Sequence, residues 1–154
     1  IARQCPVPLL LVARNETQPY SRALSAIDFS LCACSALEQG YRLLPADAQL
    51  HAVHVFDPDK GTPGQIEAQQ QIQRALIEQL LHDEAQKLPD KGARLSHSVY
   101  DGGILRRLQE QLKVQRSDLL VLGSHGRSAL SQALLGSLAQ HFLHKAPCDV
   151  LVVR

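Results

Sequence analysis

The chain has 154 residues, of which 45% are hydrophobic and 20% are charged. This length and apolar content are typical of one globular domain with a proper core rather than two small ones. Sixteen Lys and Arg residues nearly balance fifteen Asp and Glu residues, which leaves a formal net charge of +1. Such a balance excludes the basic field that recruits nucleic acid or an anionic membrane by charge alone, so we expect neither partner.

The sequence carries no signal for export or membrane insertion. No apolar run reaches the length needed to cross a bilayer, and the N-terminus lacks the pattern of a signal peptide. The four cysteines show neither CxxC spacing nor pairing with a spaced histidine, so they predict reduced thiols and no metal site. We therefore expect a soluble, cytoplasmic protein.

The apolar pattern alternates between strand and helix along the chain. Strands are predicted at residues 21–28, 49–56, 94–100, 118–123 and 149–153. Helices are predicted at about 30–44, 65–88 and 131–145, and over the spacing Ile104, Leu108 and Leu112. The last two strands are continuous apolar runs, which is typical of parallel strands covered on both faces. The pattern predicts a doubly wound α/β fold with ligands beyond the carboxyl ends of the strands.

A glycine-rich stretch, "GSHGRSALSQALLGS" at residues 123–137, follows the fourth predicted strand. Gly123 and Gly126 would expose backbone N–H groups to a phosphate, with Arg127 adding a charge-assisted bond. Gly136 falls inside the predicted helix, where it and the Ser137 hydroxyl would allow close approach of a ligand. The alternative is a tight turn and close packing of the helix, which the spacing alone does not exclude. Walker A, GxGxxG and GxSxG patterns do not occur.

The last 34 residues carry a resemblance to a known family. "VLGSHGRSALSQALLGSLAQHFLHKAPCDVLVVR" (121–154) resembles the C-terminal signature of the universal stress proteins, whose ATP-binding members use the pattern G-x2-G-x9-G-[ST]. The resemblance extends back through "LSAIDFS" (24–30) and "LHAVHVFD" (50–57), and it covers residues 21–154. It implies a Rossmann-like fold that binds adenine nucleotides, with a five-stranded parallel sheet and helices on both faces.

The resemblance also implies which residues meet the nucleotide. Asp28 would face the ribose and adenine, although its position beside Ser30 also fits a helix cap. The full set that the resemblance implies is Ala26, Asp28, Val55, Leu122, Gly123, Gly126, Arg127, Gly136, Ser137 and Leu138. The ligand would be ATP, or else ADP or AMP, with or without Mg²⁺.

Twenty residues precede the first strand of the resemblance. "CPVPLLLVAR" (5–14) is similar to the chain's own ending, "CDVLVVR" (148–154), because both have Cys-x-Val and then Leu-Val-x-Arg. We expect residues 1–20 to be the terminal strand and linker of a preceding stress-protein domain, and residues 21–154 to be one complete domain. The alternative is an unrelated apolar leader. The leader should pair with the edge strand 149–153, within one chain or between two, and this edge should support a homodimer or a tandem-domain contact.

The sequence is compatible with three functions. The leading hypothesis is a regulatory or stress-response domain that holds ATP with little turnover and is not an enzyme. A slow ATPase or phosphotransferase is the second, but His125 is the only titratable residue near the glycine loop that could assist catalysis. The third is a dimerisation scaffold that forms half of a tandem protein and binds no nucleotide.

Overall fold

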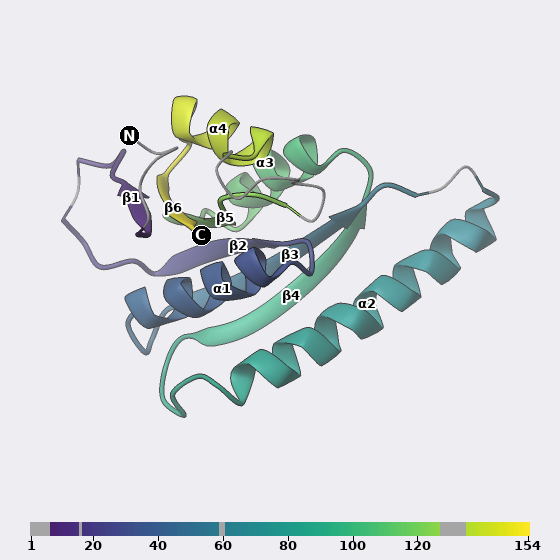
Figure 1. Cartoon of the computed structure of the whole chain (residues 1–154), viewed down its shortest axis with the longest axis horizontal. Helices are drawn as coiled ribbons and strands as arrows, with labels where there is room; N and C mark the ends of the chain where they lie inside the picture. Colours follow the sequence, from purple (N-terminus) through teal and green to yellow (C-terminus); the bar gives the residue numbers. More distant parts are fainter. Residues whose placement is uncertain (1–6, 16, 59–60, 127–134) are drawn as a thin grey trace.

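The computed structural model describes residues 7–15, 17–58, 61–126 and 135–154. Strands and helices alternate along these residues (Figure 1). The strands are β1 (Leu9–Leu11), β2 (Arg22–Ile27), β3 (Gln49–Phe56), β4 (Arg94–Asp101), β5 (Leu119–Gly123) and β6 (Asp149–Val153). The helices are α1 (Leu31–Leu43), α2 (Pro63–Ala85), α3 (Ile104–Val114) and α4 (Ser137–His144).

The strands form one sheet in the order β1-β6-β5-β2-β3-β4. The five strands from β2 to β6 run parallel, and β1 alone is antiparallel. After β1, the chain enters the central strand β2, builds outward through β3 and β4, and then returns to β5 on the other side of β2. The predicted doubly wound parallel sheet is confirmed, and its switch point lies between β2 and β5.

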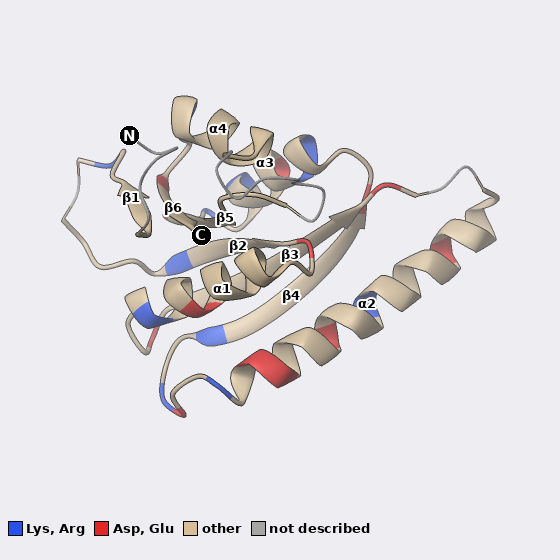
Figure 2. Cartoon of the chain, viewed as in Figure 1, with Lys and Arg blue, Asp and Glu red and all other residues tan. Residues whose placement is uncertain are grey.

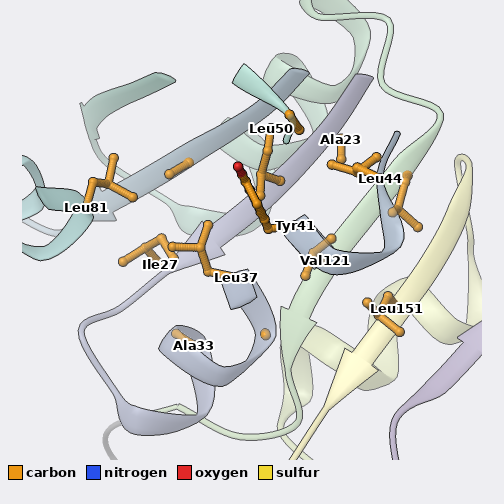
Figure 3. Close-up of a cluster of buried hydrophobic side chains, with 14 of the residues drawn as sticks. Ala23, Ile27, Ala33, Leu37, Tyr41, Leu44, Leu50, Leu81, Val121 and Leu151 are labelled. Carbon is orange, nitrogen blue, oxygen red and sulfur yellow. The ribbon is translucent and has the colours of Figure 1, made fainter. Parts of the chain in front are cut away.

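Two layers of helices cover the sheet and make two cores. On one face Leu37 of α1 and Leu81 of α2 pack against the sheet in the cluster drawn in Figure 3. On the other face Leu108 of α3 and Phe142 of α4 pack against β5 and β6. The central strand residues are buried between the two layers, which explains why β5 and β6 are apolar without alternation.

Charged residues of both signs are distributed over the molecule, as the near-zero net charge indicates. Figure 2 shows acidic and basic residues of both signs spread over α1, α2 and the strand ends. Among the described residues, no helix is long and apolar enough to span a membrane.

The start of the last helix differs most from the prediction, while α2 begins two residues and ends three residues earlier than predicted. Helix α4 begins at Ser137, and Gly136 is its N-cap with extended backbone angles, so the prediction that Gly136 lies inside a helix is wrong. The apolar pattern misled because it runs on before the cap. Residues 127–134, including Arg127, lie outside the described residues.

The leader adds an edge strand to the same sheet. Leu9, Leu10 and Leu11 pair antiparallel with Val152, Leu151 and Val150. The predicted pairing of the leader with strand 149–153 is confirmed, and it occurs within one chain. The buried carboxylate of Asp149, which is 1% exposed, accepts hydrogen bonds from Ala13 N, Arg14 N, Arg14 Nε and the Tyr20 hydroxyl.

Candidate functional site

A cavity of about 370 Å³ opens at the carboxyl ends of β2 and β5. This is the switch point of the sheet, where the chain leaves neighbouring strands toward opposite faces and a crevice forms between the connections. The lining residues come from the ends of both strands and from the first turns of helices. They are Ala26, Ile27, Asp28, Ala33, Ile104, Leu122, Gly123, His125, Gly126, Gly136, Ser137, Leu138 and Ala139.

Eight of the ten residues predicted from the resemblance line this cavity. The two exceptions are Arg127, which lies outside the described residues, and Val55, which is half-buried and packs against the core under α3 and α4. The prediction missed Ile104, the first residue of α3, whose side chain is 40% exposed. An apolar residue directly after the Gly102–Gly103 turn was the only sequence signal for it.

The glycines of the motif are explained in part by contacts within the protein. A Cβ on Gly123 would lie 3.1 Å from the carbonyl carbon of Cys32, at the start of α1. A Cβ on Gly136 would lie 3.2 Å from Ser124 O, which also accepts a hydrogen bond from Gly136 N. Both positions therefore favour glycine, because a side chain would require the neighbouring backbone of α1 or of the loop after β5 to move by a few tenths of an ångström.

Gly126 differs, because its close neighbour is a functional group. A Cβ there would lie 2.8 Å from Asp28 Oδ2 and, among the described residues, would meet no backbone atom within 4 Å. The loop after β5 thus approaches the carboxylate that follows β2. Two residues that are 98 positions apart in the sequence share one wall of the cavity.

The carboxylate of Asp28 is held beside the start of α1. Its Oδ1 accepts hydrogen bonds from the backbone N–H and the hydroxyl of Ser30. Ser30 is the N-cap of α1 and accepts from Ala33 N at 3.1 Å. The helix cap is therefore Ser30, while Asp28 supports it with one oxygen and approaches Gly126 with the other.

The residue between them, Phe29, has a backbone φ of +62°, in the left-handed region that bulky residues rarely adopt. Its ring lies 4.5 Å from that of His54, which is buried and bonded through Nδ1 to Ile27 O at 2.7 Å. The ring contact offsets the backbone cost, and the bend turns the chain from β2 into α1 directly at the cavity.

Beneath the glycine loop lies a small polar cluster. The Ser124 hydroxyl and His125 Nδ1 are 2.9 Å apart, and the thiol of Cys32 donates to Val153 O at 3.1 Å. The Ser124 contact orients the ring of His125, which lines the cavity. Helix α4 also begins at the cavity, where the free N–H groups of a first turn favour an anion.

The arrangement suits a ligand that is part apolar, part hydroxylated and part anionic. Ala26, Ile104 and Leu122 supply apolar surface, Asp28 supplies an acceptor for hydroxyl groups, and the start of α4 supplies donors. Asp28 is the only carboxylate among the lining residues that the structure describes, and no group of three His, Cys, Asp or Glu residues there could hold a metal ion.

A family profile and a curated relative both match this chain to the same protein family. A sequence profile of the universal stress protein family matches residues 19–154. A universal stress protein of Methanocaldococcus jannaschii is 27% identical over 154 residues, which cover 93% of this chain and 87% of that protein.

Solved structures share the fold. The universal stress protein UspA from Lactobacillus plantarum has a TM-score of 0.74 at 23% identity, covering 90% of this chain and 100% of that one. A universal stress protein in complex with cAMP has a TM-score of 0.63 at 23% identity, covering 89% and 98%. A universal stress protein from Archaeoglobus fulgidus matches 99% of this chain but 51% of its own length, with a TM-score of 0.64 at 19% identity.

Proposed function

The chain belongs to the universal stress protein family, and we propose that it is a regulatory member that holds ATP, ADP or AMP in this cavity with little or no turnover. The observation that carries the proposal is the cavity at the switch point, where Asp28, Gly126 and the start of α4 face one space. A structural relative is known in complex with a nucleotide, cAMP, which supports the ligand class.

Each part of the nucleotide has a partner in the proposal. Asp28, which lines the cavity, accepts hydrogen bonds from the ribose hydroxyls. The base lies against Ala26 and Ile104, which line the cavity whereas Val55 does not. The phosphates lie near Gly126, Gly136 and Ser137, where the first turn of α4 attracts negative charge. Arg127 would add a cation there.

A bound Mg²⁺ would be held mainly by the phosphates. Phosphoryl transfer needs carboxylates for the metal and a group that orients the nucleophile. Asp28 alone among the described lining residues offers a carboxylate, and its Oδ1 is already engaged by Ser30. This favours storage or sensing of the nucleotide over an ATPase or phosphotransferase. His125 is the residue that an enzymatic alternative would have to use.

Nucleotide titration tests the proposal. Thermal unfolding with ATP, ADP, AMP or cAMP, each with and without Mg²⁺, should show stabilisation of about 2.7 kcal/mol when the ligand is at one hundred times its Kd. Guanine nucleotides are the matched ligand control. No shift with any adenine nucleotide at millimolar concentration would refute the proposal, and phosphate release near 1 per second, about the lower limit for kinases, would refute the lack of turnover.

The proposal for residues 1–20, the leader, is separate from nucleotide binding. We propose that residues 1–20 are the terminal strand and linker of a preceding stress-protein domain and that residues 21–154 form one domain. The pairing of β1 with β6 and the similarity between "LVAR" (11–14) and "LVVR" (151–154) support this. The half-length match to the Archaeoglobus fulgidus protein is consistent with two such domains in one chain.

Because β1 occupies the outer edge of β6, a contact between domains would continue the sheet through this pair. Deleting residues 1–14 should expose β6 and raise the apparent mass in sedimentation. An unchanged mass and unchanged solubility would contradict the proposed role of this edge. We also propose a cytoplasmic location, which fits the free thiols of Cys32, Cys34 and Cys148.

A further inference from the structure

A second cavity, of about 360 Å³, lies between the C-terminal ends of α3 and α4. Ser117, two residues before β5, and Cys148, which directly precedes β6, both line it. The cavity is therefore at the amino edge of the sheet, whereas the candidate nucleotide site is at the carboxyl edge. No described residue lines both cavities.

Two lysines border this second cavity. Lys113 comes from the last turn of α3 and Lys145 caps α4, and neither has an ion-pair partner among the described residues. The carboxylates of Asp118 and Asp149, which are close to this cavity in the sequence, accept hydrogen bonds from residues between Arg14 and Arg22. Asp118 accepts from Ser21 and Arg22, and Asp149 accepts from Arg14 and Tyr20.

The helix dipoles do not cancel the lysine charges. Each helix C-terminus contributes roughly half a negative charge. The two lysines and the two helix ends together therefore carry a net charge of about +1. The final carbonyls are also satisfied locally. Leu112 O accepts from Ser117 N at 3.0 Å, Lys113 O from Arg116 N at 3.1 Å, and His141 O from Lys145 N at 2.9 Å. The ammonium groups thus remain available to an external anion.

The walls of the cavity combine an apolar floor with one unsatisfied polar atom. Phe142 and Leu112 are 1% and 5% exposed, and burial raises the pKa of the Cys148 thiol to about 12, so this wall is uncharged. The hydroxyl oxygen of Ser117 is buried and has no hydrogen-bond partner among the described residues. An unpaired buried hydroxyl costs about 1–3 kcal/mol, which a ligand oxygen would offset.

We propose that this cavity binds a small monocarboxylate with an apolar body, of the medium-chain fatty acid class. The carboxylate lies between Lys113 and Lys145 and accepts from Ser117, while the apolar chain lies against Leu112 and Phe142. The volume is at the lower end of the range for small-molecule sites, which matches a short chain rather than a long lipid. This proposal is independent of nucleotide binding at the other edge of the sheet.

Titration with octanoate, followed by amide NMR of the full chain, tests the proposal, with 1-octanol as the uncharged control. Octanoate should shift the resonances of Lys113, Ser117 and Lys145, and 1-octanol should bind at least about tenfold more weakly. Saturation of the first cavity with ATP should leave the octanoate affinity unchanged.

Variants distinguish the contribution of the lysine charges to octanoate binding from that of the apolar surface. The double variant Lys113→Gln with Lys145→Gln should weaken octanoate binding by about tenfold or more, and Ser117→Ala by a smaller factor. Lys91→Gln, an exposed lysine in the loop before β4, is the matched control and should bind like the parent. Absence of octanoate shifts at millimolar concentration, or equal binding by the double variant and Lys91→Gln, would overturn the proposal.

Discussion

Replacing Arg14 with alanine should destabilise the junction between the leader and the domain by about 3 kcal/mol. The guanidinium lies 3.0 Å from Asp149 Oδ2, and the carboxylate is almost fully buried at the first position of β6. Burial raises the pKa of Tyr20 to about 12, and its bond to Asp149 adds to the shift, so the hydroxyl stays protonated and donates to the same oxygen. The network joins residues more than 120 positions apart in sequence.

The magnitude follows from the burial of the carboxylate. Removing one partner of a buried ion pair costs about 3–5 kcal/mol, because the remaining charge stays buried without compensation. Arg14 keeps 18% of its side chain exposed, and Asp149 retains the bonds from Ala13 N, Arg14 N and Tyr20. We therefore expect the lower end of that range.

Urea denaturation measures the global effect, and amide hydrogen exchange over Leu9–Leu11 detects local release of β1 through those N–H groups that bond to β6. Asp118→Asn is a matched control, because Asp118 also accepts three hydrogen bonds, from Ser21 and Arg22, but at an exposed position. It should cost about 1 kcal/mol or less. If Arg14→Ala changes neither measurement more than Asp118→Asn does, the ion pair does not hold the leader.

Two further predictions concern the same sheet edge and the end of α3. Burial raises the pKa of the Asp149 carboxyl, but hydrogen bonds from Arg14, Tyr20 and Ala13 together lower that pKa below 3.8. The ionised carboxylate therefore stabilises the fold above pH ~4, and this contribution is lost as the pH falls through the folded-state pKa. The stability difference between the parent and Asp149→Asn should accordingly shrink in acid titrations, and a constant difference would contradict this. Arg116, with φ of +50° at the end of α3, occupies a position that favours glycine, so Arg116→Gly should raise the unfolding free energy by roughly 1 kcal/mol in urea melts; a loss would contradict it.

Strands β5 and β6 could be predicted because their sequences are continuously apolar and their residues are buried. The apolar run at Leu119–Leu122 is buried at every position, and such a pattern is incompatible with an exposed strand. The pairing of the leader could also be predicted, because a copy of an edge strand carries the same apolar pattern as its partner. These signals are local, or are repeated within the sequence itself.

Features that depend on long-range contacts were not predictable from spacing. Asp149 is only the polar first residue of an apolar strand in sequence, yet its partners come from the leader. Gly136 has the sequence context of a helix interior, but the backbone of the loop after β5 approaches it too closely for a side chain. In both cases the determining neighbour is distant in the chain, so no local pattern contains it.

The same contacts decide which glycine best separates binding from folding. A side chain at Gly136 would press on backbone atoms of Ser124 and His125, so a loss of binding there would also follow from a disturbed loop. Among the residues that the structure describes, a Cβ at Gly126 would meet only the carboxylate of Asp28. Gly126→Ala therefore displaces the proposed ribose acceptor while leaving the backbone contacts of the loop intact.

Gly126→Ala should lower ATP affinity by at least about tenfold in calorimetric titration, because a hydrogen bond to a charged group contributes roughly 1.5–3 kcal/mol. Its unfolding free energy should stay within about 0.5 kcal/mol of the parent's, as for most exposed positions. Gly64→Ala is the matched control, since a Cβ at that position, in the first turn of α2, meets nothing within 4 Å. If Gly126→Ala and Gly64→Ala bind ATP equally well, the proposed contact between Asp28 and the nucleotide is wrong.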